Sequence, residues 1–129
     1  MNRRHDQRGS VTLEAVLLFG VVIFTIMMVI QVALFAHASG LADAAAREGT
    51  RTLRVSGAPK AGEERAASFL RQHGAQVVLD PTVGAKTRDG VGSVEVAGHA
   101  VTLIPGLSLP VRGFSSGPLE AFDAVGAVP

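Results

Sequence analysis

The residues best placed for chemistry lie near the start of the chain, where Gly9-Ser10 is followed by the carboxylate of Glu14. If a protease cuts after Gly9, the new α-amino group of Ser10 is a cation beside an apolar segment. A carboxylate at the edge of such a segment carries a cost on membrane insertion and usually has a partner. Two interpretations follow: Glu14 of one copy pairs with the Ser10 amine of another, or Glu14 turns toward the lipid headgroups.

Other candidate groups form no catalytic or ligand-binding pattern. The four histidines are widely spaced and show no metal-ligand spacing: His5, His37, His73 and His99. Ser115-Ser116-Gly117 lacks the Gly-x-Ser-x-Gly elbow of a serine nucleophile. The absence of cysteine excludes disulfides and thiolate metal sites. We therefore expect a protein that is not an enzyme and that has no cofactor, metal or small-molecule substrate.

The segment that follows Glu14 predicts a membrane-spanning helix. Residues 15–35 contain no Asp, Glu, Lys or Arg. As a helix at ~1.5 Å per residue they would cover ~31 Å, the thickness of the hydrocarbon core of a bilayer. The basic residues before this segment predict a cytoplasmic N-terminus and a translocated C-terminal part: Arg3, Arg4 and Arg8. The rest of the chain has no basic face for nucleic acid.

Helical patterns continue beyond the apolar segment. The alanine-rich residues 36–54 favour helix, so we expect one helix from Ser10 to Leu53 that leaves the membrane near His37. A second helix is expected over Lys60–His73, ended by Gly74. Its buried stripe has the i, i+3, i+4, i+7 spacing of an amphipathic helix: Ala66, Phe69, Leu70 and His73.

The pattern changes from helix to strand after Ala75. A short strand is expected over Gln76–Leu79, ended by Pro81, and a later strand over Leu109–Phe114. Apolar positions between them indicate one or two further strands: Val94, Val96, Val101 and Leu103. The predicted class is α+β, a long N-terminal transmembrane helix continuing into a small head with a second helix and a 3–4-stranded antiparallel sheet.

Four regions are expected along the chain. They are a cytoplasmic basic leader over 1–9, a transmembrane helix over 10–36, an extracytoplasmic α+β head over 37–118 and a loose tail over 119–129. This organisation predicts a single-pass protein of the cell membrane.

Two segments carry a resemblance to a known family. Gly9-Ser10-Val11-Thr12-Leu13-Glu14 before an apolar helix resembles the type III leader of type IV pilin-like proteins. Gln31, His37-Ala38 and Ala44-Ala45-Ala46-Arg47-Glu48-Gly49-Thr50-Arg51 are similar to the TadE-like family of minor pseudopilins. Two later segments look similar to small actinobacterial members of that family: Gly92-Ser93-Val94-Glu95-Val96 and Ile104-Pro105-Gly106-Leu107. These proteins serve the tight-adherence (Flp) pilus.

The resemblance implies specific partners and roles. A membrane prepilin peptidase would cleave between Gly9 and Ser10, and Glu14 would take the role of the fifth-position glutamate of pilins. It also implies a pilin-like head and a non-enzymatic part in pilus assembly or adhesion, with other pseudopilins, the assembly machinery and membrane lipid as partners. Pilins often begin with Phe, so Ser10 leaves N-methylation open.

Two alternatives remain. Ala36-His37-Ala38 fits the small-x-small site of a secretory signal, which predicts a secreted protein beginning at Ser39. Against it, the apolar region is longer than the ~7–15 residues of a signal peptide. The other alternative is an uncleaved single-pass envelope protein whose head binds a partner.

Overall fold

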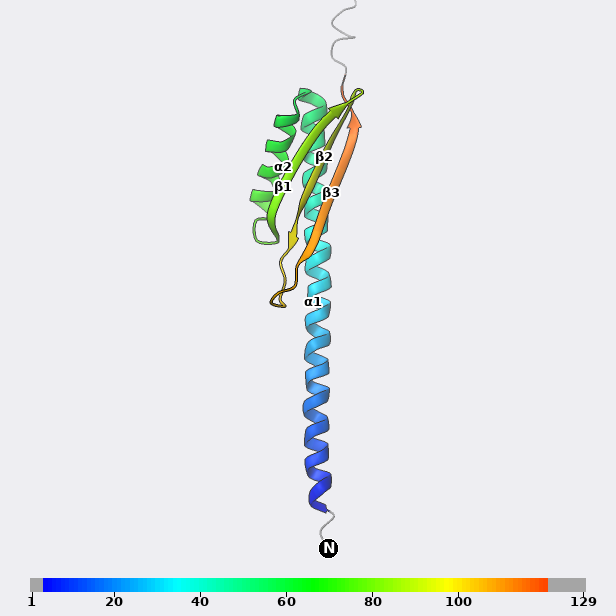
Figure 1. Cartoon of the computed structure of the whole chain (residues 1–129), viewed down its shortest axis with the longest axis vertical. Helices are drawn as coiled ribbons and strands as arrows, with labels where there is room; N and C mark the ends of the chain where they lie inside the picture. Colours follow the sequence, from blue (N-terminus) through cyan, green and yellow to red (C-terminus); the bar gives the residue numbers. More distant parts are fainter. Residues whose placement is uncertain (1–3, 121–129) are drawn as a thin grey trace, which may run out of the picture. The chain divides into compact units, whose positions relative to one another are not determined.

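The computed structural model describes residues 4–120, with side chains described from residue 7. Its elements are α1 (Arg4–Ser56), α2 (Pro59–His73), β1 (Val78–Arg88), β2 (Val91–Ala100) and β3 (Leu109–Pro118) (Figure 1). The predicted α+β class is confirmed, with a long N-terminal helix, a second helix and a three-stranded antiparallel sheet. Contacts divide the chain into two units, Met1–Ala33 and Leu34–Pro129, and α1 contributes to both.

Helix α1 is longer at both ends than the predicted Ser10–Leu53. Its alanine-rich second half favours helix, so no break marks the end of the apolar segment. The helix ends where Gly57 adopts the left-handed conformation, with φ of 68°, and donates its N–H to the Leu53 carbonyl oxygen at 2.8 Å. Glycine adopts this conformation without the steric penalty of a β-carbon.

Helix α2 confirms the predicted second helix. Proline at its first position has the φ angle that a helix requires and lacks only an N–H that would have no helical partner. Ala66 and Leu70 are buried, whereas His73 is exposed and stacks on Phe69 with ring centroids 4.5 Å apart. Gly74 ends the helix as predicted, but its φ of −132° shows that it is not a left-handed cap.

The three strands are antiparallel, in the order β1-β2-β3. The two-residue turn Asp89-Gly90 joins β1 to β2, with φ angles of 52° and 76°. Positive φ at both positions matches the twist of the flanking strands, which favours this tight hairpin.

The predicted end of the first strand before Pro81 is wrong. In the structure β1 continues to Arg88, and its register shifts between Leu79 and Thr82. This bulge leaves Asp80 and Pro81 out of the pairing, so the missing N–H of proline breaks no ladder hydrogen bond.

The other strand boundaries also differ from the prediction. Val101 and Leu103 lie outside β2, which ends at Ala100. Strand β3 continues to Pro118 instead of ending at Phe114, because residues 115–117 pair with 92–94 of β2. The residues after the predicted end at Phe114 therefore stay in the sheet, since pairing with a central strand overrides the weak strand preference of serine and glycine.

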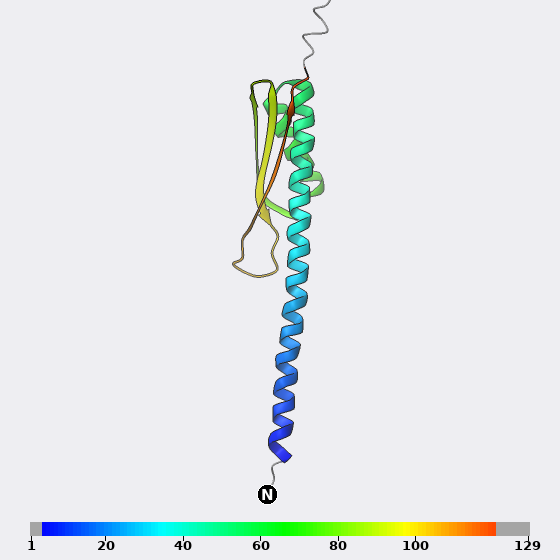
Figure 2. The same ribbon diagram turned by 90° about the vertical axis from the view of Figure 1, so that its right-hand side faces the viewer.

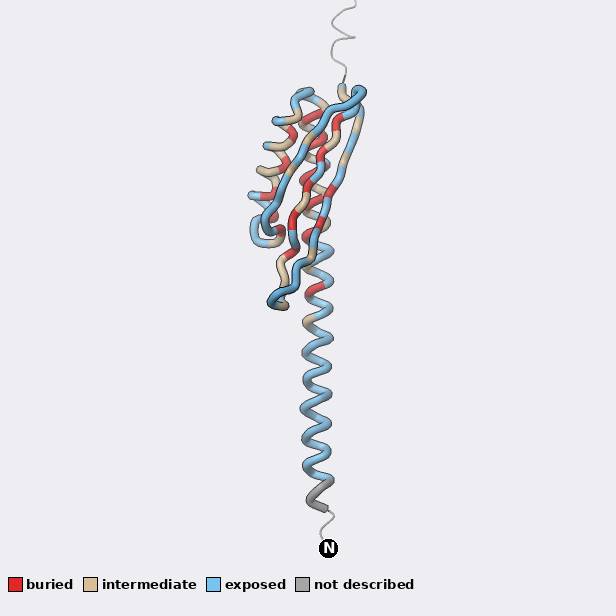
Figure 3. The backbone as a smooth tube through the Cα atoms, viewed as in Figure 1, coloured by how far each residue is buried: buried red, intermediate tan, exposed pale blue. Residues whose placement is uncertain are grey.

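Unit Leu34–Pro129 has two layers. Helix α2 and the part of α1 after residue 34 cover one face of the sheet (Figure 2), and buried residues lie between the layers (Figure 3). On β2, Val94 and Val96 are buried while Glu95 between them is exposed, the period-two pattern of a half-buried strand. The α1 side of the core consists of small residues and one leucine: Ala38, Ala42, Ala45, Ala46 and Leu53.

Glycines allow close backbone packing between the two helices and between α1 and the sheet. A β-carbon on Gly49 would lie 2.8 Å from the Gly62 carbonyl oxygen, and one on Gly62 would lie 2.9 Å from the Gly49 carbonyl oxygen. These distances are shorter than a van der Waals contact, so α1 and α2 approach closely only because both residues lack side chains. A β-carbon on Gly113 of β3 would overlap the Ala42 backbone of α1.

Both edges of the sheet are tied to the helices. At β1, the Ala85 N–H donates to Glu63 Oε1 of α2 at 3.1 Å. At β3, Thr50 Oγ1 donates to the Ser115 carbonyl oxygen at 3.1 Å and Arg54 Nε to that of Pro118 at 2.7 Å. These bonds satisfy edge groups that would otherwise attract another strand.

The last described residues are also held in place. Leu119 donates its N–H to the Gly90 carbonyl oxygen at 2.8 Å, and Glu120 to that of Arg54 at 3.1 Å. The expectation of a loose tail from 119 is therefore wrong for these two residues, and the rest of that tail lies outside the described residues.

An ion pair joins α1 to α2. Arg65 Nη2 and Nε lie 3.0 and 3.1 Å from Glu48 Oε1. The two side chains are 41% and 32% exposed, so water screens the pair. We expect Glu48→Gln to lower the free energy of unfolding by about 1 kcal/mol or less, measured by urea unfolding of the full chain in detergent. A loss as large as that of a core cavity would contradict a screened surface pair.

Candidate assembly segment

The predicted cleavage and assembly residues all lie on α1. Gly9, Ser10 and Glu14 are exposed, and a β-carbon on Gly9 would have no neighbouring atom within 4 Å. Ser10 and Glu14 are four residues apart in a helix, so the structure places them one turn apart on the same side. Among side chains 7–120, Glu14 has no ion-pair partner.

The predicted topology residues are only partly described. Arg8 is exposed on α1, and its carbonyl oxygen accepts a hydrogen bond of 2.9 Å from Thr12 Oγ1. Arg4 is the first residue of α1, but its side chain lies outside the described residues, as does the whole of Arg3.

The surface of α1 on both sides of Glu14 is apolar and uncovered. All but one of the large apolar side chains between residues 11 and 32, Met27 being the exception, are 40% to 68% exposed: Val11, Leu13, Val16, Leu17, Leu18, Phe19, Val21, Val22, Ile23, Phe24, Ile26, Met28, Val29, Ile30 and Val32. Soluble monomers rarely expose a contiguous apolar area of this extent. Within the described residues, this is the one helix long and apolar enough to cross a membrane, which suggests a single-pass anchor.

A shallow apolar groove lies on this part of α1. Thr25, Met28, Val29 and Val32 line it. Thr25 Oγ1 donates to the Val21 carbonyl oxygen at 2.8 Å, so its hydroxyl is already satisfied. A groove of this kind can accept a side chain of a neighbouring apolar helix, and threonine is one of the small residues that are enriched where membrane helices pack.

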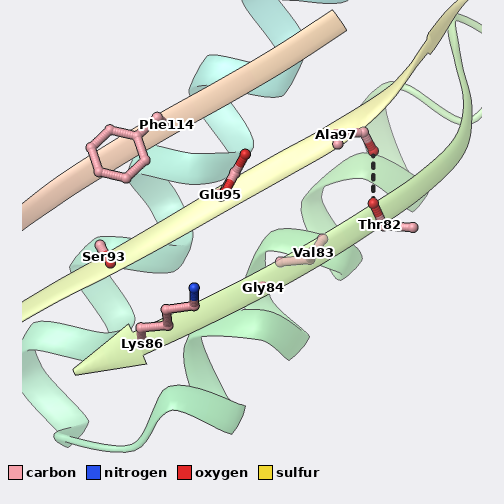
Figure 4. Close-up of a pocket in the computed structure, with 8 residues that line it drawn as sticks. All are labelled: Thr82, Val83, Gly84, Lys86, Ser93, Glu95, Ala97 and Phe114. Atoms are coloured by element: carbon pink, nitrogen blue, oxygen red, sulfur yellow. Dashed lines mark hydrogen bonds between the residues drawn. The ribbon is translucent and has the colours of Figure 1, made fainter. Parts of the chain in front are cut away.

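The uncovered face of the sheet carries a second depression, of about 460 Å³ (Figure 4). Its lining combines one aromatic ring, two charged groups and small residues: Thr82, Val83, Gly84, Lys86, Ser93, Glu95, Ala97 and Phe114. Glu95 Oε1 lies 3.9 Å from Arg112 Nη1, and both side chains are largely exposed. Over the range in which the structure describes side chains, no three His, Asp or Glu residues gather for a metal ion.

The fold and these surfaces define a class of protein: a small α+β domain on a helix long and apolar enough to cross a membrane. Residues 9–51 match the family model described as TadE-like protein, which confirms the family predicted from the sequence. No curated protein matches the chain, and no solved structure matches it.

The TadE-like segment reaches from the predicted cleavage site into the head. It includes Ala45, Ala46 and Gly49, which are buried, and Glu48, which pairs with Arg65. In this structure the Ala-Arg-Glu-Gly part of the segment therefore packs α1 against α2 and the sheet. The match associates the chain with the Tad pilus and its assembly machinery in general, and TadE-like components of that pilus are generally non-enzymatic.

Proposed function

We propose that this protein is a TadE-like minor pseudopilin, a membrane-anchored and non-enzymatic component of tight-adherence (Flp) pilus assembly. The observation that carries the proposal is the uncovered apolar surface of α1 within a segment that matches the TadE-like family. Such a surface needs lipid or other apolar helices around it. The protein acts by helix–helix association with other pseudopilins, and residues 15–35 carry that association.

The proposal gives the chain one orientation. The basic leader over 1–9 stays in the cytoplasm, in accordance with the positive-inside rule, and the head lies on the other side of the membrane. A prepilin peptidase cuts between Gly9 and Ser10. Glu14 then pairs with the Ser10 amine of a neighbouring subunit and sets the stagger between helices. The exposure of Glu14 and its lack of an ion-pair partner among side chains 7–120 support this role.

The structure disfavours the alternative of a secreted protein cut after Ala38. Ala38 is 0% exposed, lies in the interior of α1 and belongs to the core of the head. A cut there would remove Ala38 from the packed core. The uncleaved envelope protein is the competing function, and the N-terminus distinguishes it from the proposal.

Mass spectrometry of the membrane-extracted protein tests the cleavage. The proposal expects a mature form that begins at Ser10. A mature form that still begins at Met1 would overturn the processed pseudopilin in favour of the uncleaved anchor, and one that begins at Ser39 would support the secreted protein.

The role of Glu14 predicts a separate defect. Glu14→Ala should be processed normally but should form roughly tenfold less crosslinked product with sister pseudopilins, a loss equivalent to about 1.4 kcal/mol of association. Glu14→Gln keeps the shape of the side chain without its charge and should show the same defect, whereas Glu14→Asp should retain part of the association. Normal crosslinking of both neutral variants would rule out the ion pair.

A further inference from the structure

The connection between β2 and β3 is apolar at its surface. Residues 100–111 contain no Asp, Glu, Lys or Arg. Leu103 is 44% exposed, Leu107 is 38% exposed and Pro105 is also exposed. These side chains are presented to the surroundings by residues 101–108, which we call the β2–β3 loop.

One turn of this loop is closed by hydrogen bonds of its own residues. Ile104-Pro105-Gly106-Leu107 forms a turn in which the Leu107 N–H donates to the Ile104 carbonyl oxygen at 3.2 Å, and Gly106 has φ of 80°. The Thr102 hydroxyl lies 3.3 Å from the Ile104 carbonyl oxygen and 3.1 Å from that of Leu107. These internal bonds lower the cost of moving the turn out of water.

The loop lies at the end of the head where the chain enters from the apolar segment. Along β3, Gly113 contacts Ala42, and the Pro118 carbonyl oxygen accepts a hydrogen bond from Arg54. Residue numbers along β3 and along α1 therefore increase in the same direction. The residues that precede β3 consequently lie at the end of the head that contains Leu34. The charged hairpin Arg88-Asp89 lies at the opposite end of the head (Figure 1).

We propose that the β2–β3 loop is a membrane contact, which inserts its apolar side chains into the boundary between headgroups and acyl chains. The partner is the lipid surface around the anchor helix. The uncharged composition of the loop, its exposed apolar side chains and its place at the Leu34 end of the head favour lipid over a folded partner. Such insertion reaches ~5–10 Å into the interface and holds the head against the bilayer. The inference rests on the membrane insertion of α1 in the proposed function.

Because the chain contains no cysteine, one introduced cysteine can be labelled specifically to measure how deeply its position lies in the bilayer. The full-length protein is reconstituted in phosphatidylcholine vesicles with and without nitroxide-labelled lipid, and carries one fluorophore at Leu107→Cys, Val22→Cys or Asp89→Cys. We expect strong lipid quenching at residues 22 and 107 and none at 89. Quenching at 22 without quenching at 107 would overturn the loop contact and leave the anchor intact. No quenching at 22 would overturn the membrane anchor itself, and the loop contact with it.

Two further measurements separate lipid from protein as the partner. With the fluorophore at 107, Leu103→Asp should remove most of the lipid quenching, whereas Val91→Asp should leave it unchanged. Val91 is a matched control because it is also 44% exposed and lies at the charged end of the head. Unchanged quenching in Leu103→Asp would contradict the proposal. A second result would also contradict it: a fluorophore at 107 that lipid does not quench and that iodide cannot reach. If iodide reaches this fluorophore once the protein is diluted in lipid, the group that shields it is a neighbouring copy.

Discussion

Gly113→Ala is expected to lower the free energy of unfolding of the head by about 3 kcal/mol or more, the upper range for overpacking in a core. The new β-carbon would overlap the Ala42 backbone, and a helix backbone cannot move aside as a flexible side chain can. Strand β3 would have to move away from α1, which would also weaken the Thr50–Ser115 hydrogen bond at this edge. The change should appear in urea unfolding of the full chain in detergent, followed by circular dichroism.

Gly84→Ala is the matched control for this prediction. Gly84 also lies within the sheet, but a β-carbon there would have no neighbouring atom within 4 Å. We expect this variant to be as stable as the wild type or slightly more stable, since alanine loses less conformational entropy on folding than glycine does. Equal stability of both variants would contradict the close approach of β3 to α1.

Gly9→Leu is expected to abolish processing between Gly9 and Ser10. The structure places this peptide bond within α1, so a peptidase must open the helix before it can reach the carbonyl group. Glycine makes that opening easier, since it is ~1 kcal/mol less favourable in a helix than alanine. Leucine removes this weakness and adds a branched side chain beside the scissile bond. The mass of the membrane-extracted protein should then correspond to a start at Met1.

Gly20→Leu is the control for Gly9→Leu. Gly20 is another exposed glycine of α1 with no atom near its β-position, but it lies outside the proposed cleavage site. Its substitution should leave the mature N-terminus at Ser10. If Gly9→Leu still yields a protein that begins at Ser10, the role of Gly9 in processing is wrong. Loss of processing in both variants would indicate a general effect on the helix.

The helical elements could be predicted because their signals are local. A long apolar segment, an alanine-rich continuation and the spacing of apolar residues in the next helix each act over short distances in the sequence. The predicted end of α1 and both predicted ends of α2 therefore lie within three residues of the observed ones, whereas α1 begins six residues before the predicted Ser10. The spacing of Ser10 and Glu14 on one side of α1 follows from helix geometry alone. The residues of the TadE-like segment indicated the family for the same reason, and the family match confirms it.

The strands and the close contacts were decided by tertiary structure. The bulge that carries β1 past Pro81 and the pairing that extends β3 to Pro118 depend on β2, a segment distant in the sequence. The roles of Gly49 and Gly113 depend on which backbone passes beside each glycine, and no local pattern records that. Sequence by itself determined an apolar helix, a helical continuation and a TadE-like segment. Only the packing of α1 and α2 on the sheet decided which glycines are required, where the strands end and where the β2–β3 loop lies, because each of these depends on contacts between distant residues.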